Sequence, residues 1–375
     1  MNQRNFIVVL VLIAAALAGW MFYTSQQAVQ AEPIQEISTK YWNSSHADAE
    51  SEAFIHWNED DPAEIPVFCA RCHSTSGFTD FIGADGSEAG KVDAPGKIND
   101  PISCTACHSD AAHALDSVSF PSGNEVSGTG KNSVCMSCHG GLSAGTGVAK
   151  ANEGKDLDVP MEGSSMQGPH YFHAAAVHQG TDAGVGYEYE GKTYVGAFKH
   201  ANTVDSCVSC HDPHSLHTQD IPESDASLCS TCHSNVSGWA DYRSVSMSKV
   251  DYDGDGTVEP VFDEIEGMKA ILIEALGKYS IAVTGTGFGV NFDAYPYAFI
   301  DTNQDGTIDE SEGIFPNQYN TFTPRMQRAA FNLMFAVKEP AAYVHNADYV
   351  LQLMYDAIED LSELSGVTTA GLTRP

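Results

Sequence analysis

The motif Cys207-Val208-Ser209-Cys210-His211 is the part of this 375-residue sequence that decides the fold. Its pattern, Cys-x-x-Cys-His, recurs as Cys69-Ala70-Arg71-Cys72-His73, Cys104-Thr105-Ala106-Cys107-His108, Cys135-Met136-Ser137-Cys138-His139 and Cys229-Ser230-Thr231-Cys232-His233. The five copies contain all ten cysteines of the chain. Two thiols separated by two residues can bond to the two vinyl groups of one haem, and the adjacent histidine can then ligate the iron. The spacing therefore predicts five covalently attached haem c groups.

Two other uses of the ten cysteines are chemically reasonable. An exported chain with this many cysteines could form five disulfides. A zinc site built from four cysteines would leave the five adjacent histidines unexplained. Because every cysteine lies in the same five-residue pattern, haem attachment is the better interpretation.

The expected fold class follows from the small number of residues per haem, which is roughly 70. With so little protein around each haem, the haems themselves form much of the core. Residues 69–240 show little sustained helical or strand periodicity. We expect a mainly α chain with much irregular loop, wrapped around a haem stack, followed by a helical C-terminal region. The expected divisions are a five-haem region at 32–240 and a calcium-binding helical region at 241–375, docked on the haems.

The N-terminus has the features of a targeting segment. Arg4 precedes an apolar run at residues 6–23, and small residues at Val29 and Ala31 suit cleavage by a signal peptidase. The run is also just long enough to span a bilayer. Residues 1–31 are therefore expected to be a cleaved signal peptide or an N-terminal membrane anchor. Either alternative exports the rest of the chain to the periplasm or the cell exterior.

The excess of acidic over basic residues limits the classes of partner that the protein can bind. The formal net charge is −32, with 50 acidic and 18 basic residues. Such a chain lacks the lysines and arginines that bind nucleic-acid phosphates. The acidic surface serves either solubility alone or a redox partner with a basic face.

Ten histidines outside the motifs could supply second axial ligands. The candidates chosen by position are His56, His170, His200, His214 and His345. His113 is a further candidate. His173 and His178 lie in the same segment as His170 and are alternatives to it. His46 and His217 carry no positional signal. Ligation by methionine stays open, whereas histidine on both sides of an iron gives the lower potentials.

Two acidic loops in the C-terminal region resemble the twelve-residue calcium loop. The second loop offers Asp301, Asn303, Asp305, Thr307, Asp309 and Glu312 as ligands. The first loop offers Asp251, Asp253, Asp255, Thr257 and Glu259. Its twelfth position is Phe262, so Asp263 or Glu264 would have to replace the missing carboxylate. The alternative is a pair of Asp/Gly turns on an acidic surface.

Helices are expected around these loops. One spans residues 264–276 and stops at Gly277. A second opens at Thr323-Pro324 and ends before Pro340. A third begins at Asn346, directly after His345, and ends at Gly366. If His345 ligates an iron, this region is docked on the haems.

The sequence resembles bacterial multihaem c-type cytochromes that carry calcium-loop insertions. The resemblance lies in His56-Trp57, Gly168-Pro169-His170-Tyr171, residues 186–192, residues 207–214 and Val344-His345-Asn346. Residues 207–214 also look like the paired haem motifs of outer-membrane electron conduits. The resemblance implies electron transfer in periplasmic or extracellular respiration, with other multihaem cytochromes as possible partners. It supports the five chosen distal histidines and leaves His113 in doubt.

Two other functions stay open. A multihaem reductase of a small nitrogen or sulfur oxyanion needs an iron with an open position and cationic groups nearby. Pentahaem nitrite reductases place a lysine where the motif histidine would be at their active haem, whereas all five motifs here end in histidine. The other alternative is a subunit of a self-assembling cytochrome filament. The leading prediction is an electron-transfer protein rather than an enzyme.

Overall fold

The computed structural model describes residues 33–200, 204, 206–218, 227–236 and 239–375. In these residues helices are the main regular structure, and two antiparallel sheets have two short strands each. This agrees with the predicted mainly helical chain with much irregular loop. The predicted targeting segment, residues 1–31, lies outside the described residues. No helix in the described part of the chain is long and apolar enough to cross a membrane.

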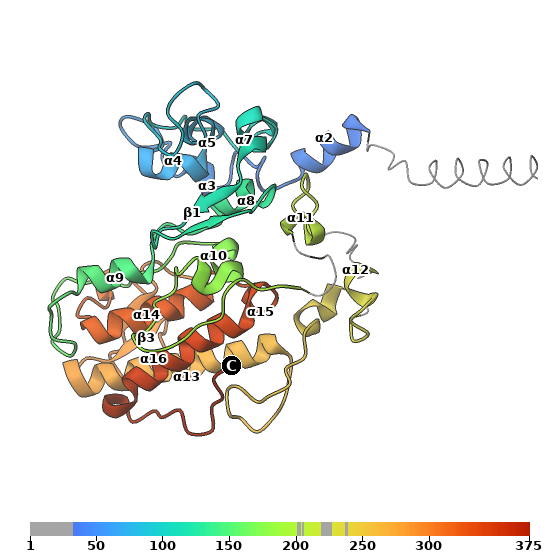
Figure 1. The fold of residues 1–375 in the computed structure, drawn as a ribbon. Helices are drawn as coiled ribbons and strands as arrows, with labels where there is room; N and C mark the ends of the chain where they lie inside the picture. The colour runs from blue at the N-terminus through green and yellow to red at the C-terminus, as the bar shows by residue number, and fades with distance from the viewer. Residues whose placement is uncertain (1–32, 201–203, 205, 219–226, 237–238) are drawn as a thin grey trace, which may run out of the picture.

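The N-terminal part of the chain consists of short helices joined by loops (Figure 1). These helices are α2 (Ile34–Trp42), α3 (Glu52–Ile55), α4 (Val67–His73), α5 (Thr75–Phe81), α6 (Cys104–Cys107), α7 (Asp110–Ala114), α8 (Asn132–Cys138), α9 (Gly145–Ala151), α10 (Ala174–Gln179), α11 (Cys207–Cys210) and α12 (Ser227–Ser230). The 3₁₀ turns η1 (Gly180–Asp182) and η2 (Trp239–Ser244) and a hairpin of β1 (Ser117–Ser119) and β2 (Glu125–Ser127) complete this part.

Buried apolar clusters in the first 115 residues are small. One consists of Trp57, Ile65 and Ala70, and another of Phe78, Ile82, Ala106 and Ala112. Short segments with so little core need another source of buried apolar surface to be stable.

The C-terminal part is a bundle of longer helices (Figure 1). Its elements are α13 (Val261–Thr284), β3 (Phe288–Val290), β4 (Ala298–Ile300), η3 (Phe315–Asn317), α14 (Pro324–Val337), α15 (Ala342–His345) and α16 (Ala347–Ser365). Helix α14 is buried along most of its length, since Ala330, Phe331 and Phe335 have no exposed surface. Helices α13 and α16 pack against it and against each other.

Two of the three predicted C-terminal helices have the expected ends. Thr323 caps α14 by accepting a hydrogen bond from the Met326 N–H, and Asn346 caps α16 by accepting from the Tyr349 N–H. Gly366 ends α16 in the left-handed conformation.

The predicted stop at Gly277 is wrong. Helix α13 continues through Gly277 and ends before Gly285, which adopts a φ of 72°. A Cβ at position 277 would lie 3.2 Å from the Phe288 carbonyl oxygen of β3. The glycine therefore allows β3 to approach the helix and does not end it.

The largest hydrophobic core has members on both sides of residue 240. Val118, Val148 and Val177 belong to it together with residues of α13, α14 and α16. The segment from β1 to α10 thus packs on the C-terminal helices. The division between residues 240 and 241 stays a prediction.

Candidate haem sites and calcium loops

Each attachment motif forms a turn of helix that ends on its histidine. The backbone N–H donates to the carbonyl of the first cysteine at 2.9 Å for His108, His139 and His211, and at 2.8 Å for His233. The first motif lies within α4, which ends at His73. Residues four positions apart share one face of a helix, so each turn presents its first thiol and its imidazole together.

The thiols are available for haem attachment. None of the ten cysteines, all of which are described, forms a disulfide. The Cys72 Sγ lies 3.9 Å from the Cys138 carbonyl oxygen, and the Cys138 Sγ lies 3.7 Å from that of Arg71. The Asn132 side chain, at the start of α8, accepts a hydrogen bond from the Cys207 N–H at 3.1 Å. The third motif thus neighbours both the first and the fourth.

A second histidine ring faces the ring of every motif histidine. The distances between ring centres are 5.9 Å for His73–His170, 6.2 Å for His108–His214, 6.2 Å for His139–His46, 6.4 Å for His211–His345 and 6.2 Å for His233–His200. An iron with a metal–nitrogen bond of about 2 Å on each side would separate two imidazole ring centres by roughly 6 Å. The residues present therefore fit haem groups held between pairs of histidines.

Four of the five predicted distal histidines take part in these pairs, and His56 does not. His56 is exposed, its Nδ1 lies 2.8 Å from the Glu52 carboxylate, and its ring contacts Trp57. His46, which carries no positional signal in the sequence, stacks on His139 instead, at an angle of 23° between the rings. Burial lowers the pKa of His46 to about 4, and the nearby His139 adds to this, so His46 is neutral at pH 7, as an iron ligand must be.

The reserve candidate His113 also comes near a motif histidine. Its ring centre is 6.0 Å from that of His108, with the two rings at 89°, whereas His214 lies at 6.2 Å and 16°. One iron bound to His108 has a single opposite position. His214 and His113 are therefore alternatives for it.

The predicted alternatives beside His170 have other surroundings. His173 has no exposed surface, and its Nδ1 lies 3.2 Å from the His170 carbonyl oxygen. Its Nε2 is buried without a hydrogen-bond partner. The ring of His178 contacts Phe198 rather than a motif histidine.

The Nδ1 atoms of several paired histidines have fixed partners. That of His73 lies 2.8 Å from the Ala53 carbonyl oxygen, that of His139 lies 2.8 Å from the Phe172 oxygen, and that of His211 lies 3.3 Å from the Leu216 oxygen. A carbonyl can only accept, so it fixes the proton on Nδ1. The Nε2 atom is then free to bind a metal, and the ring is held in orientation.

Residues 169–173 serve two of the motifs at once. His170 faces His73 of the first motif, while the carbonyl of Phe172 accepts from His139 of the third. His170 and Phe172 have φ angles of 87° and 50°. Such conformations cost of order 1–3 kcal/mol for residues other than glycine and cluster at functional sites.

The two acidic loops share one pattern of hydrogen bonds. In the second loop the Asp301 carboxylate accepts from the Gly306 N–H at 2.8 Å, and Glu312 accepts from the Thr302 N–H at 2.8 Å. Asp301 and Glu312 are buried, at 3% and 4% exposure, although both are acidic residues. Asn303, Asp305, Thr307 and Asp309 lie between them, and the Asp305 carboxylate accepts from the Thr307 N–H at 2.9 Å.

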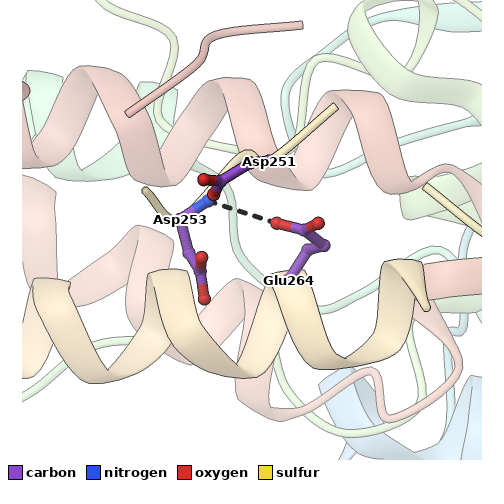
Figure 2. A group of neighbouring side chains, drawn as sticks. All are labelled: Asp251, Asp253 and Glu264. Atoms are coloured by element: carbon purple, nitrogen blue, oxygen red, sulfur yellow. Dashed lines mark hydrogen bonds between the residues drawn. The ribbon is translucent and has the colours of Figure 1, made fainter. Parts of the chain in front are cut away.

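In the first loop Asp251 corresponds to Asp301 and accepts from the Gly256 N–H at 2.9 Å. Glu264 is fully buried and accepts from the Tyr252 N–H at 2.7 Å. It also accepts from the Asp253 N–H at 3.2 Å, as Figure 2 shows. Glu264, the fourth residue after the Pro260 cap of α13, thus occupies the place of the missing position-12 carboxylate, and Asp263 is exposed.

Carboxylates gather more closely in the first loop than in the second. Oxygens of Asp251, Asp253 and Glu264 lie within 4.8 Å of one another, as do those of Asp253, Asp255 and Glu259. In the described residues no such group of three forms in the second loop. Burial raises the pKa of Asp253, and the neighbouring carboxylates raise it further. Thr257 lies between Asp255 and Glu259, and its N–H donates to Asp255 at 2.6 Å.

A family model described as a doubled CXXCH motif matches residues 200–238, which hold the fourth and fifth attachment motifs. With five attachment turns in one chain, this match and the relatives below make the protein a multihaem c-type cytochrome.

The similar proteins are polyhaem cytochromes of Geobacter sulfurreducens. The C-type polyheme cytochrome OmcC of strain ATCC 51573 / DSM 12127 / PCA is 25% identical, over 83% of this chain and 45% of its own length. OmcB of strain DL-1 / KN400 is 24% identical, over 92% of this chain and 50% of its own length. The chain thus spans about half the length of the curated relatives it matches. No solved structure matches it.

Proposed function

We propose that this chain transfers electrons as a pentahaem c-type cytochrome in which each iron has a histidine on both sides. The observation that carries the proposal is the second imidazole opposite every motif histidine, at ring-centre distances between 5.9 and 6.4 Å. A bound haem supplies an iron that takes up and releases one electron. The chain's own residues would hold each haem by two thioethers and two imidazoles.

The proposed distal ligands are His170, His214, His46, His345 and His200, for the first to the fifth motif in that order. This set replaces His56 by His46, because His56 pairs with Glu52 at the surface. Two neutral imidazoles on each iron favour low potentials. With both axial positions filled, the chain offers no open iron to a substrate, which supports electron transfer over the reductase alternative.

Intact mass and electron paramagnetic resonance test this proposal together. The mass of the mature protein should exceed that of the polypeptide by five haems, and no thiol should react with an alkylating reagent. Nearly all irons should be six-coordinate and low-spin. A mass that fits four haems and one disulfide would remove one motif. A strong high-spin signal that changes on adding nitrite or sulfite would favour the reductase.

Calcium is proposed as a second cofactor, held by both acidic loops. Support comes from Asp301 and Glu312, which are buried yet have no basic partner among the described contacts, and from Glu264, which supplies the carboxylate that the first loop lacks in sequence. Hard cations with six to eight oxygen ligands suit such loops. Isothermal calorimetry of the chelator-treated protein should show calcium uptake at two sites, and uptake at neither would reduce both loops to acidic turns.

We also propose that the protein is exported to the periplasm or the cell exterior. There it would exchange electrons with redox partner proteins. The apolar run at residues 6–23 and the acidic excess support this. N-terminal sequencing of the mature protein separates a cleaved signal from a retained anchor. Size-exclusion chromatography of the holoprotein separates a monomer from a self-assembling filament subunit.

A further inference from the structure

Glu339 is a buried carboxylate that contacts a proposed haem ligand. It lies between α14 and α15 and is 2% exposed. Its Oε1 atom is 3.1 Å from the Nδ1 of His345 and accepts a hydrogen bond from the Ala341 N–H at 3.2 Å. The ring of His345 in turn faces that of His211 in the fourth motif.

This partner differs in kind from those of three other paired histidines. The Nδ1 atoms of His73, His139 and His211 lie against backbone carbonyls, which are neutral. At His345 the partner of the imidazole is instead the carboxylate of Glu339, which is an anionic side chain. The contact lies at the fourth haem site, where His345 faces His211.

The position of Glu339 is held from several sides. The Lys338 carbonyl accepts from the Phe172 N–H at 2.9 Å, and the Lys338 N–H donates to Met334 at 2.9 Å. On the other side the His345 N–H donates to the Ala341 carbonyl at 3.1 Å. The carboxylate and the imidazole are thus fixed by one short stretch of backbone.

Among the described residues, His345 is the side chain that forms an ion pair with Glu339. The nearby His173 is fully buried. The Lys338 ammonium lies over the rings of Tyr171 and Tyr297, at 4.0 and 3.7 Å from their centres.

We infer that Glu339 is a positioning residue that lowers the reduction potential of the iron held by His211 and His345. The inference rests on the proposed function, because it requires His345 to be an axial ligand. A carboxylate that accepts the Nδ1 proton makes the imidazole a stronger donor through Nε2. A buried negative charge also favours the ferric over the ferrous iron, because little water screens it. Both effects lower the potential of this one haem.

The experiment is a potentiometric titration of the full-length holoprotein, with the Glu339→Gln variant compared with the wild type. Glutamine keeps the size and an accepting oxygen but removes the charge. One of the five midpoint potentials should rise, with at least a tenfold change in the ratio of reduced to oxidised iron, which is about 59 mV for one electron. The His345→Ala variant identifies that haem, because it should turn the same iron high-spin.

Glu52→Gln is the matched control. Glu52 contacts the Nδ1 of His56 at 2.8 Å, but that pair is exposed and His56 faces no motif histidine. This variant should shift no potential. Glu339→Asp is the second test where glutamine prevents folding: its shorter carboxylate weakens the hydrogen bond, so the same potential should rise by a smaller amount.

Separate outcomes would overturn the inference and the proposed function. If every Glu339 variant that carries five low-spin haems leaves all potentials unchanged, Glu339 does not tune the iron, and bis-histidine ligation still stands. If Glu339→Gln instead creates a high-spin haem, the residue only holds His345 in place, and the inference also fails. If His345→Ala leaves every iron low-spin, the ligand assignment itself is wrong.

Discussion

Histidine and glutamate pair at two places in the described chain, and the two pairs have opposite surroundings. His56 and Glu52 lie one helical turn apart at the surface. His345 and Glu339 are joined across a chain turn, and Glu339 is buried. An exposed pair of this kind contributes about 0–1 kcal/mol to stability, whereas a buried carboxylate acts strongly on its neighbours. At the residue scale, burial thus separates a surface contact from one that bears on an iron site.

The pairing of His46 with His139 leads to the first prediction. His46→Ala should convert one of the five haems to a high-spin form, because the third motif loses the imidazole opposite His139. His56→Ala is the matched variant and should leave all irons low-spin. Electron paramagnetic resonance of both oxidised variants checks this, with intact mass confirming five haems in each. A high-spin iron in His56→Ala, and none in His46→Ala, would restore the ligand set predicted from sequence.

A glycine of α13 provides the second prediction. A Cβ at Gly267 would clash with the carboxylate of Asp253 in the first acidic loop. Gly267→Ala should therefore destabilise the protein by about 1–3 kcal/mol and weaken calcium uptake at that loop. Gly147→Ala is the control: this exposed position in α9 has open space around it, so alanine should stabilise the helix by about 0.5–1 kcal/mol. Denaturant unfolding of both variants measures the difference, and equal stabilities would mean that the loop shifts freely.

At the scale of elements, an ionic network ties α14 to its neighbours. Asp158 accepts from the Arg325 Nε at 2.7 Å and from the Tyr279 hydroxyl of α13 at 2.7 Å. Arg325 and Arg328 also donate to Asp360 of α16. The hydrogen bond from Arg325 is the main cause that lowers the pKa of Asp158 below its usual value. The loop after α9, which holds Asp158, and the three long helices are thus joined by one set of hydrogen bonds and charges.

The lowered pKa of Asp158 gives the third prediction, on pH dependence. A carboxylate whose folded pKa is below its unfolded pKa of about 3.9 stabilises the protein above that pH, and the contribution is lost as the pH falls through the folded value. Asp158→Asn should cost about 1 kcal/mol at pH 7, and this difference should shrink below pH 4. The exposed control Glu153→Gln should cost little at either pH. Unfolding curves at pH 7 and pH 3 check this, and a difference that grows on acidification contradicts it.

Local signals in the sequence predicted more of the elements than of the contacts between them. The ends of α14 and α16 follow from Thr323, Asn346 and Gly366, because caps act within one turn. The extension of α13 through Gly277 could not be predicted, since it depends on the approach of β3, which is distant in sequence.

The residues of the candidate sites also fall into those that the sequence alone could predict and those that depend on the fold. The five attachment turns follow from the motif spacing alone. His46 and Glu339 have no local signal, because each acquires its role from a residue or motif that the fold brings near. For Glu264 the sequence offered two choices, and the helical turn of α13 directs Glu264 inward while Asp263 is exposed.

On the scale of the whole molecule, the haem motifs and the acidic loops are linked through the C-terminal helices. The first loop leads into α13, which packs on α16, and α16 begins two residues after His345. The chain's end returns to the same loop, where the Thr373 N–H donates to the Tyr252 carbonyl at 3.0 Å. A change in that loop therefore has a packed route to the fourth haem site.

Removing calcium should consequently affect both stability and one haem. Without a cation, the carboxylates of Asp251, Asp253 and Glu264 repel one another within 4.8 Å. Calcium at ten times its dissociation constant would stabilise the folded state by about 1.4 kcal/mol per site, so a chelator should lower the melting temperature by a few degrees. It should also shift the potential or the spin state of the iron assigned to His211 and His345. Glu264→Gln should reproduce the loss at the first loop, whereas Glu266→Gln, on the exposed side of the same helix, should not. Melting curves and haem spectra that stay unchanged with chelator, in a protein that takes up calcium, would show that the loops and the haems are not coupled.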